Sequence, residues 1–195
     1  MQRYTLVFLI LQIFDFSTVI ADQNYRSNYV GQDKRIIKSL SIDDIKQLEN
    51  GKGWGLAKAA ELNGVPGPSH LLEMKKEINL TNQQQTKIKK LFKKMQQQAK
   101  VLGKQLIVME KKLNESFANK TVKKQSLKMN LEKISQLRMQ LRYVHLSAHL
   151  ETPSILTKRQ INLYNKLRGY NSTDPCLNMP KGHDAKMWKS HNGCV

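Results

Sequence analysis

The sequence lacks the patterns that commonly surround catalytic residues. It contains no His-Glu-x-x-His motif, no glycine-rich loop after an apolar strand and no serine in a strand-turn-helix context. Period-two alternation of apolar and polar residues is also absent over any useful length, which argues against β-strands. We therefore predict an all-α protein that is not an enzyme.

A long uninterrupted apolar run is missing as well. Residues 6–11 are apolar and follow Arg3, but Asp15 breaks the run before residues 19–21, so it is poorly suited to span a membrane. A basic end, an apolar middle and compact residues before the cleavage point indicate a secretory signal peptide over residues 1–21. A retained membrane anchor and a buried first helix are the alternatives. We expect a cleaved leader and an exported protein.

Acidic residues are scarce, because 15 Asp and Glu stand against 33 Lys and Arg, for a net charge of +18. Such a balance is typical of nucleic-acid binding. However, 26 of the 33 basic residues are lysine, no aromatic side chains interleave with them, and the leader directs the chain out of the cytoplasm. We therefore expect no nucleic-acid partner. Acidic unfolded proteins, anionic lipid headgroups or envelope polysaccharide suit the charge better. A compositional bias toward Lys, Asn and Ile is the competing explanation.

Cysteine occurs only twice, at Cys176 and Cys194. In an exported chain we expect the two to form a disulfide, which would stabilise the tail by roughly 3 kcal/mol on the chain-entropy estimate. His183 and His191 lie between them without the close Cys-x-x-Cys spacing of zinc knuckles. A metal clamp in the tail is therefore the less favoured interpretation.

Turn residues and changes in periodicity divide the chain into four parts. We expect a signal peptide (1–21), a flexible lead with short helices and a Pro/Gly corner (22–68), a helical domain (69–168) and a Cys- and His-containing tail (169–195). In the lead, Ser41 and Asp44 have capping-box spacing, and Ile42 is predicted to share the buried face of the helix that follows. Ser69 is predicted to cap a further short helix.

The strongest pattern lies between residues 82 and 118, where apolar residues recur every three or four positions for about ten turns. A tight reversal near Thr121 leads to a second amphipathic helix, which Pro153 ends. So short a connection predicts a long antiparallel helical hairpin with short flanking helices. Because two such stripes make a thin core, we expect a homodimer that shares it. A generic coiled coil is the alternative.

A Leu-Thr-x-x-Gln pattern occurs twice, before two of the predicted helices. The copies comprise Leu80, Thr81 and Gln84, and Leu156, Thr157 and Gln160. Each copy alone fits a capping box, in which the Thr and Gln side chains satisfy each other's backbone amides. Two copies that bracket a helical hairpin in an exported chain resemble the Spy/CpxP family of periplasmic chaperones, over about residues 69–168. Residues 60–68 and 141–150 resemble the subgroup described as periplasmic heavy-metal sensors or resistance proteins.

The resemblance implies a cradle-shaped, antiparallel dimer in the periplasm that binds unfolded or acidic envelope proteins without ATP, and contact with a membrane surface is compatible with the charge. Exposed lysines would attract such clients, and flexible methionines off the main apolar stripe would adapt to varied surfaces. The candidate client contacts are Lys87, Lys90, Lys94, Met129 and Met139. Met95 and Met109, by contrast, are predicted to fill the core.

His145 and His149 are four residues apart, and so lie on one face of the predicted second helix, at the edge of its apolar stripe. Two imidazoles at that spacing can hold one zinc, nickel, cobalt or copper ion. A third ligand must come from His70, from a carboxylate such as Glu73 or Glu77, or from the partner subunit. Ordinary hydrogen-bonded histidines at a helix edge are the alternative.

Overall fold

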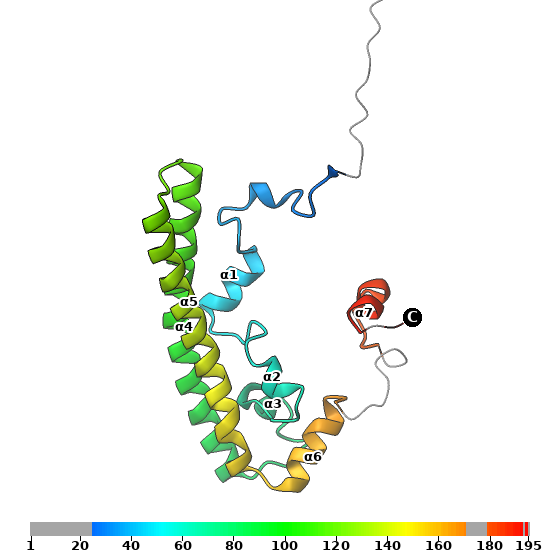
Figure 1. Ribbon diagram of the computed structural model, residues 1–195. Coiled ribbons are helices and arrows are strands. Elements are labelled where there is room, and N and C mark those ends of the chain that lie inside the picture. Colours follow the sequence, from blue (N-terminus) through cyan, green and yellow to red (C-terminus); the bar gives the residue numbers. More distant parts are fainter. Residues whose placement is uncertain (1–24, 171–178, 193, 195) are drawn as a thin grey trace, which may run out of the picture. The chain divides into compact units, whose positions relative to one another are not determined.

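The computed structural model describes residues 25–170, 179–192 and 194. These residues form the α-helices and 3-10 helices (η) η2 (Gln32–Lys34), α1 (Ile42–Glu49), α2 (Lys58–Glu61), α3 (Pro68–Glu73), α4 (Asn82–Ala118), α5 (Lys124–Glu151), η3 (Thr152–Ile155), α6 (Lys158–Leu167) and α7 (Ala185–His191) (Figure 1). No β-strand occurs in the described ranges, so the predicted all-α class is confirmed.

The chain divides into two compact units after Lys34, and the helices discussed below belong to the second unit. The predicted signal peptide, residues 1–21, lies outside the described residues and stays a prediction. In the described part, no helix combines the length and the hydropathy that a bilayer span requires. The cradle shape and the homodimer also stay predictions.

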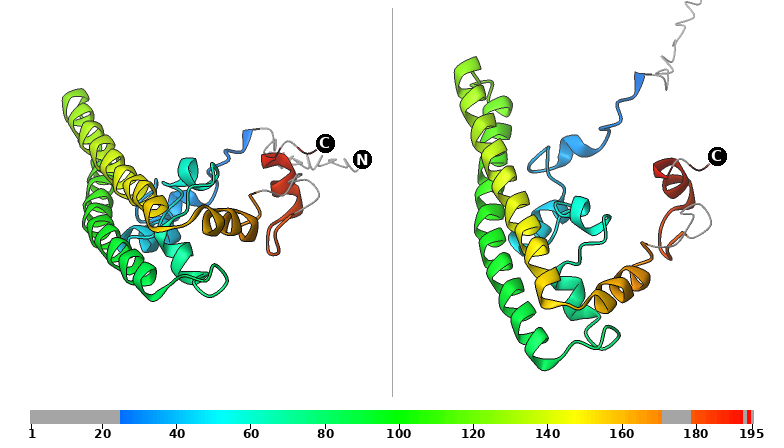
Figure 2. Two further views of the ribbon diagram at one scale, coloured as in Figure 1. Left: turned by 90° about the horizontal axis from the view of Figure 1, so that it is seen from below. Right: turned by 60° about the horizontal axis from the view of Figure 1, so that its bottom comes forward.

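Helices α4 and α5 form the predicted hairpin, with α5 lying alongside α4 (Figures 1 and 2). Thr81 caps α4, because its side chain accepts a hydrogen bond from the Gln84 amide while the Gln84 side chain accepts one from the Thr81 amide. Residues 119–123 connect the two helices. Helix α5 ends at Glu151, and Pro153 follows in η3, as the sequence predicts.

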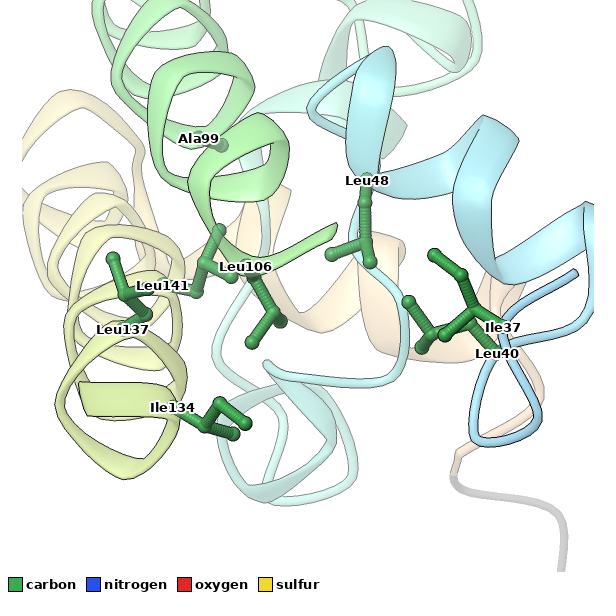
Figure 3. Packing of buried hydrophobic residues seen from close by; sticks show 8 residues of the cluster. All are labelled: Ile37, Leu40, Leu48, Ala99, Leu106, Ile134, Leu137 and Leu141. Carbon is green, nitrogen blue, oxygen red and sulfur yellow. The ribbon is translucent and has the colours of Figure 1, made fainter. Parts of the chain in front are cut away.

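The main core lies between the hairpin and the segment that contains α1 (Figure 3). Its buried members are Ile37, Leu40, Leu48, Ala99, Leu106, Ile134, Leu137 and Leu141. The last five come from the apolar stripes of α4 and α5, and each large aliphatic side chain buried here contributes about 1.5–3 kcal/mol relative to leaving it in water. The predicted amphipathic faces of the two long helices therefore do meet in a common core.

The same core includes side chains from the segment over residues 22–68 that the sequence predicts to be a lead with short helices. Ile37 and Leu40, which show no helical periodicity, are 3% and 1% exposed, and Leu48 of α1 is 2% exposed. Two helices with one apolar stripe each leave part of that stripe open to water, and covering it with these side chains is favourable. The part of the chain that carries Ile37, Leu40 and Leu48 therefore belongs to the folded core.

Helix α1 crosses α4 at Gly103, where the two backbones come close together. A Cβ atom at Gly103 would lie 2.8 Å from the carbonyl carbon of Leu48. About two helical turns further along α4, the buried Glu110 carboxylate accepts hydrogen bonds from Ser39 at 2.8 Å and from Arg138 of α5 at 2.7 Å. Close packing and a shared carboxylate thus join the segment around α1 to both helices of the hairpin.

Two local predictions are wrong. The sequence predicts Ser69 as a helix cap, whereas Gly67 caps α3 and Pro68 occupies its first position. Proline suits that position because the first amides of a helix have no partner within it. The sequence also places Ile42 on the buried face of α1, but Ile42 is 73% exposed, because the covered face of α1 is centred on Leu48.

Candidate functional site

The two Leu-Thr-x-x-Gln copies cap their helices and also bond to each other. In the second copy, Thr157 accepts from the Gln160 amide and Gln160 accepts from the Thr157 amide, as in the first copy. The side-chain amides of Gln84 and Gln160 then pair reciprocally, with N to O distances of 2.9 and 3.0 Å. Leu80 is buried, and Leu156 packs against its cluster. The motif therefore ties the start of α4 to the start of α6.

Removing this amide pair is expected to uncouple the two helix starts. In a double-mutant cycle of Gln84→Ala and Gln160→Ala, urea unfolding should give a coupling free energy of about 0.5–1.5 kcal/mol, because each single change already breaks the shared pair. A control cycle of Gln84→Ala with Gln96→Ala should be additive, since Gln96 bonds instead to the carbonyl of Asn50. Additivity in both cycles would contradict this role for the motif.

A cavity of about 490 Å³ lies between α5, α4 and the segment from residue 47 to residue 73. It is lined by both predicted metal ligands, His145 and His149, and by His70 and Glu73, which the sequence offers as third ligands. Glu77 does not line it. Within the described residues, however, no three His, Cys, Asp or Glu side chains are grouped so as to hold a metal ion. The cavity gathers the predicted residues without forming a complete site from these four residue types.

The two α5 histidines are buried, which corrects their predicted place at the edge of the apolar stripe. His145 is 3% and His149 is 5% exposed, because the chain from Val65 to Pro68 packs over this end of α5. His149 donates its Nδ1 hydrogen to the carbonyl of Val65 at 2.9 Å, since a carbonyl can only accept. A Cβ atom on Gly67 would lie 2.6 Å from the His149 ring, so only glycine allows this approach.

Burial also keeps these imidazoles neutral. It lowers the pKa of His145 to about 4, with a further contribution from the nearby His149. Burial lowers the pKa of His149 too, although the hydrogen bond to Val65 and the charge of Glu61 act in the opposite direction. His145 Nε2 has no hydrogen-bond partner among the described residues. Both side chains thus carry a nitrogen lone pair that is not protonated near neutral pH.

Glu61 lies at the centre of a hydrogen-bond network on the wall of the cavity. Its carboxylate accepts hydrogen bonds from Tyr164 at 3.0 Å, Tyr170 at 2.8 Å and Arg168 at 3.2 Å, and His70 Nε2 lies 3.5 Å away. Burial alone would raise the pKa of Glu61, but the hydrogen bonds and the neighbouring positive charges lower it overall. No spacing in the sequence predicts this network, because Tyr164 of α6, and Arg168 and Tyr170 just after α6, come from more than 100 residues away.

The predicted client-contact residues all lie exposed along the hairpin. Together with exposed apolar neighbours they form what we call the uncovered surface, which comprises Lys87, Lys90, Lys94, Val101 and Val108 of α4 and Met129, Met139 and Tyr143 of α5. The spacing of three, four or seven residues between successive α4 members places them on one face of that helix. Helices α1, α2, α3 and α6 lie on the other side of the hairpin (Figures 1 and 2).

Two grooves between α4 and α5 open beside this surface. One, of about 330 Å³, is lined by Lys104, Val108, Lys133 and Leu137, among others. The other, of about 230 Å³, is lined by residues that include Lys94 and Tyr143 of the uncovered surface. The uncovered surface thus borders one apolar groove and one groove of mixed polarity, each with lysine in its lining.

The predicted disulfide involves Cys176, which lies outside the described residues, so the pairing with Cys194 stays a prediction. Of the tail histidines, His183 packs against Trp188 with ring centroids 5.0 Å apart, and His191 Nδ1 lies 2.9 Å from the carbonyl of Met187. Both contacts lie within the tail. The structure therefore brings neither tail histidine to the cavity.

Comparison with known proteins agrees with the motif pattern. A family model described as LTXXQ motif family protein matches residues 69–168, which is just over half of the chain and coincides with the predicted helical domain. The family covers Spy/CpxP-like periplasmic proteins and heavy-metal resistance proteins, and its members are generally periplasmic. No curated protein and no solved structure matches the chain significantly. With its paired motifs and helical hairpin, this chain belongs to the LTXXQ motif family.

Proposed function

We propose that the protein is an ATP-independent, chaperone-like periplasmic protein that binds unfolded or acidic proteins through the uncovered surface. One observation carries this proposal: exposed apolar side chains continue a row of exposed lysines. Val101 and Val108 are 59% and 63% exposed, and they follow Lys87, Lys90 and Lys94 along one face of α4. Apolar residues gathered on one surface of a folded domain are typical of sites that bind another molecule.

The two kinds of side chain have different tasks in this proposal. Lysines act at long range and attract acidic chains, which raises the rate of encounter. Met129 and Met139, 62% and 58% exposed, then make short-range apolar contacts, and their flexible side chains adapt to clients of different sequence. Neither Lys90 nor Lys94 forms an ion pair with a described residue, so both charges are available to a client.

The proposal predicts that the mature protein suppresses aggregation of an unrelated, acidic, chemically denatured protein at a near-stoichiometric ratio. Replacing Val101 and Val108 with serine should at least halve that suppression, because both apolar contacts are lost. Light scattering during dilution from denaturant measures the effect. Suppression should also weaken as salt is raised, since screening shortens the range of the lysine attraction.

The matched control replaces Ile42 and Leu62 with serine, since these apolar residues are 73% and 66% exposed but lie outside the uncovered surface. The control should suppress aggregation as well as the parent protein does. No suppression at several-fold excess of the parent, or equal losses in the two double variants, would contradict the proposal.

Metal binding is the second candidate function, and a specific observation favours it. His145 Nε2 is buried and has no partner in the part of the chain that the structure describes, and the bond from His149 Nδ1 to Val65 leaves the lone pair of His149 on Nε2. An imidazole held by a backbone carbonyl through its other nitrogen is typical of metal-ligating histidines. The pair would thus be prepared to bind zinc, copper or nickel in the cavity that both residues line.

Calorimetric titration with zinc, copper and nickel tests this candidate. Replacing His145 and His149 with alanine should abolish binding of micromolar or tighter affinity, whereas replacing the exposed tail residues His183 and His191 should leave it unchanged. Equal affinities for the parent and the α5 variant would rule the cavity out as the site.

A further inference from the structure

Most polar groups on the wall of the cavity are already engaged by neighbours. His70 lies between two carboxylates, with Nδ1 2.9 Å from Glu73 and Nε2 3.5 Å from Glu61. The Glu61 carboxylate also accepts from two tyrosines and an arginine. Gln47 and Gln96 donate to Asp43 and to the carbonyl of Asn50. The carboxylates and amides therefore have partners that a hard metal ion would need to displace.

The α5 histidines differ from these groups. His145 Nε2 is buried, and no described residue bonds to it, while the Nδ1 bond to Val65 leaves the lone pair of His149 on Nε2. The two residues lie one turn apart on the same helix and line the same cavity. An unpartnered nitrogen costs free energy in a buried site unless something binds it. The cavity therefore offers two imidazole donors that are not otherwise used.

A third donor of different chemistry lines the same cavity. Met95 of α4 is 7% exposed and packs in one cluster with Ala148 and Val144 of α5. Those two residues directly precede His149 and His145 in the sequence, so Met95 packs against the turn of α5 that carries both histidines. Its thioether sulfur is a soft metal ligand. Two imidazoles and a thioether thus come from adjacent turns of facing helices.

We propose that this cavity binds a soft monovalent metal ion, with Cu(I) as its representative, through His145, His149 and the thioether of Met95. The inference rests on the metal-binding candidate above and names the metal class for it. A thioether is a soft ligand of the kind that favours Cu(I). The three ligands are also uncharged, so a single positive charge is less costly to bury among them than a double one.

Competition with the chromophoric chelator bicinchoninate, under ascorbate and without thiols, tests the proposal on the full mature chain. The parent should remove one Cu(I) per chain from the chelator, and Met95→Leu should weaken Cu(I) binding by at least about tenfold. Leucine fills nearly the same volume, so the fold is retained. Met109→Leu, a change at a partly buried methionine of the main core, is the matched control and should bind as the parent does.

Two further measurements separate the possible outcomes. X-ray absorption of the Cu(I) complex should show sulfur scattering that Met95→Leu removes, also when Cys176 and Cys194 are both replaced by serine. Zinc affinity should change less than twofold in Met95→Leu. Zinc binding without Cu(I) binding, or Cu(I) binding that Met95→Leu does not change, would overturn this inference and leave the metal-binding candidate standing. Failure to bind zinc, nickel and copper alike would overturn both.

Discussion

Replacing Gly103 with alanine is expected to lower the free energy of unfolding by about 1–3 kcal/mol, as overpacking of a close contact usually does. The added Cβ would lie 2.8 Å from the carbonyl carbon of Leu48, and a backbone atom cannot move aside as a flexible side chain can. Helix α1 must then move away from α4. Alanine favours a helix over glycine by about 1 kcal/mol. A net loss in the free energy of unfolding would therefore come from the packing of α1 against α4.

Urea unfolding followed by circular dichroism measures this change, and Gly53→Ala is its matched control. Gly53 has an ordinary backbone conformation, and no atom of the described residues lies within 4 Å of a Cβ atom built there. The control should keep or slightly increase the stability of the parent. If Gly103→Ala were as stable as the control, the close crossing of α1 over α4 would be wrong.

Acidification is the second change with a large expected effect. His145 has its pKa lowered from 6.5 to about 4 in the folded protein, because burial and the nearby His149 disfavour its charge. Between these two values the unfolded chain binds more protons, so stability is highest above pH 6.5 and is lost as the pH falls toward 4. The loss amounts to about 3 kcal/mol. His149, whose pKa is also lowered, adds in the same direction.

The carboxylates change the stability in a lower pH range than the histidines do, so the two contributions can be measured apart. Burial by itself would raise the pKa values of Asp44 and Glu61, but hydrogen bonds lower both overall, and a hydrogen bond from His70 lowers the pKa of Glu73. Their stabilising contribution is therefore lost only below their ordinary values of 3.8 to 4.5. The loss between pH 6.5 and 4.5 reports the histidines.

Chemical unfolding at a series of pH values, with a chelator present to keep the protein free of metal, measures the pH dependence. His145→Leu should flatten the curve between pH 6.5 and 4.5, because the titrating group is gone. His183→Leu, at an exposed tail residue, should leave the curve as in the parent. An unchanged slope in His145→Leu would contradict the buried, neutral state of this side chain.

Features set by local spacing could be predicted from the sequence. Helix α4 has the predicted bounds, and its cap at Thr81 forms as expected, because a capping box depends only on residues three apart. The exposure of Met129 and Met139 likewise follows from their place off the apolar stripe of α5. When apolar residues recur along a helix with a 3.6-residue period, they define the face that the helix buries.

Features that depend on long-range contacts could not be predicted. Ile37 and Leu40 cover the hairpin without any periodicity of their own. The burial of His149 depends on the corner around Gly67, which comes from more than 80 residues earlier in the chain. The bond between Gln84 and Gln160 arises only once α6 docks beside α4. Such contacts are fixed by tertiary packing, about which local spacing carries no information.

The proposed functions use different sides of α5 and can be tested apart. Met139 and Tyr143 of the uncovered surface are exposed, whereas His145 and His149, only a few residues further along, are buried in the cavity. Because a helix turns by about 100° per residue, these neighbours in sequence face different surroundings. Changes in the cavity should therefore alter metal binding without removing the client contacts.

The most direct test of the central claim is photo-crosslinking of a bound client from single positions. A photoreactive residue would replace Val101 or Tyr143 on the uncovered surface, and Ile42 or Leu62 as equally exposed controls elsewhere. We predict strong crosslinks to a denatured acidic client from the first two positions and weak ones from the controls. Equal crosslinking from all four positions, or crosslinks mainly from the controls, would contradict client binding through the uncovered surface.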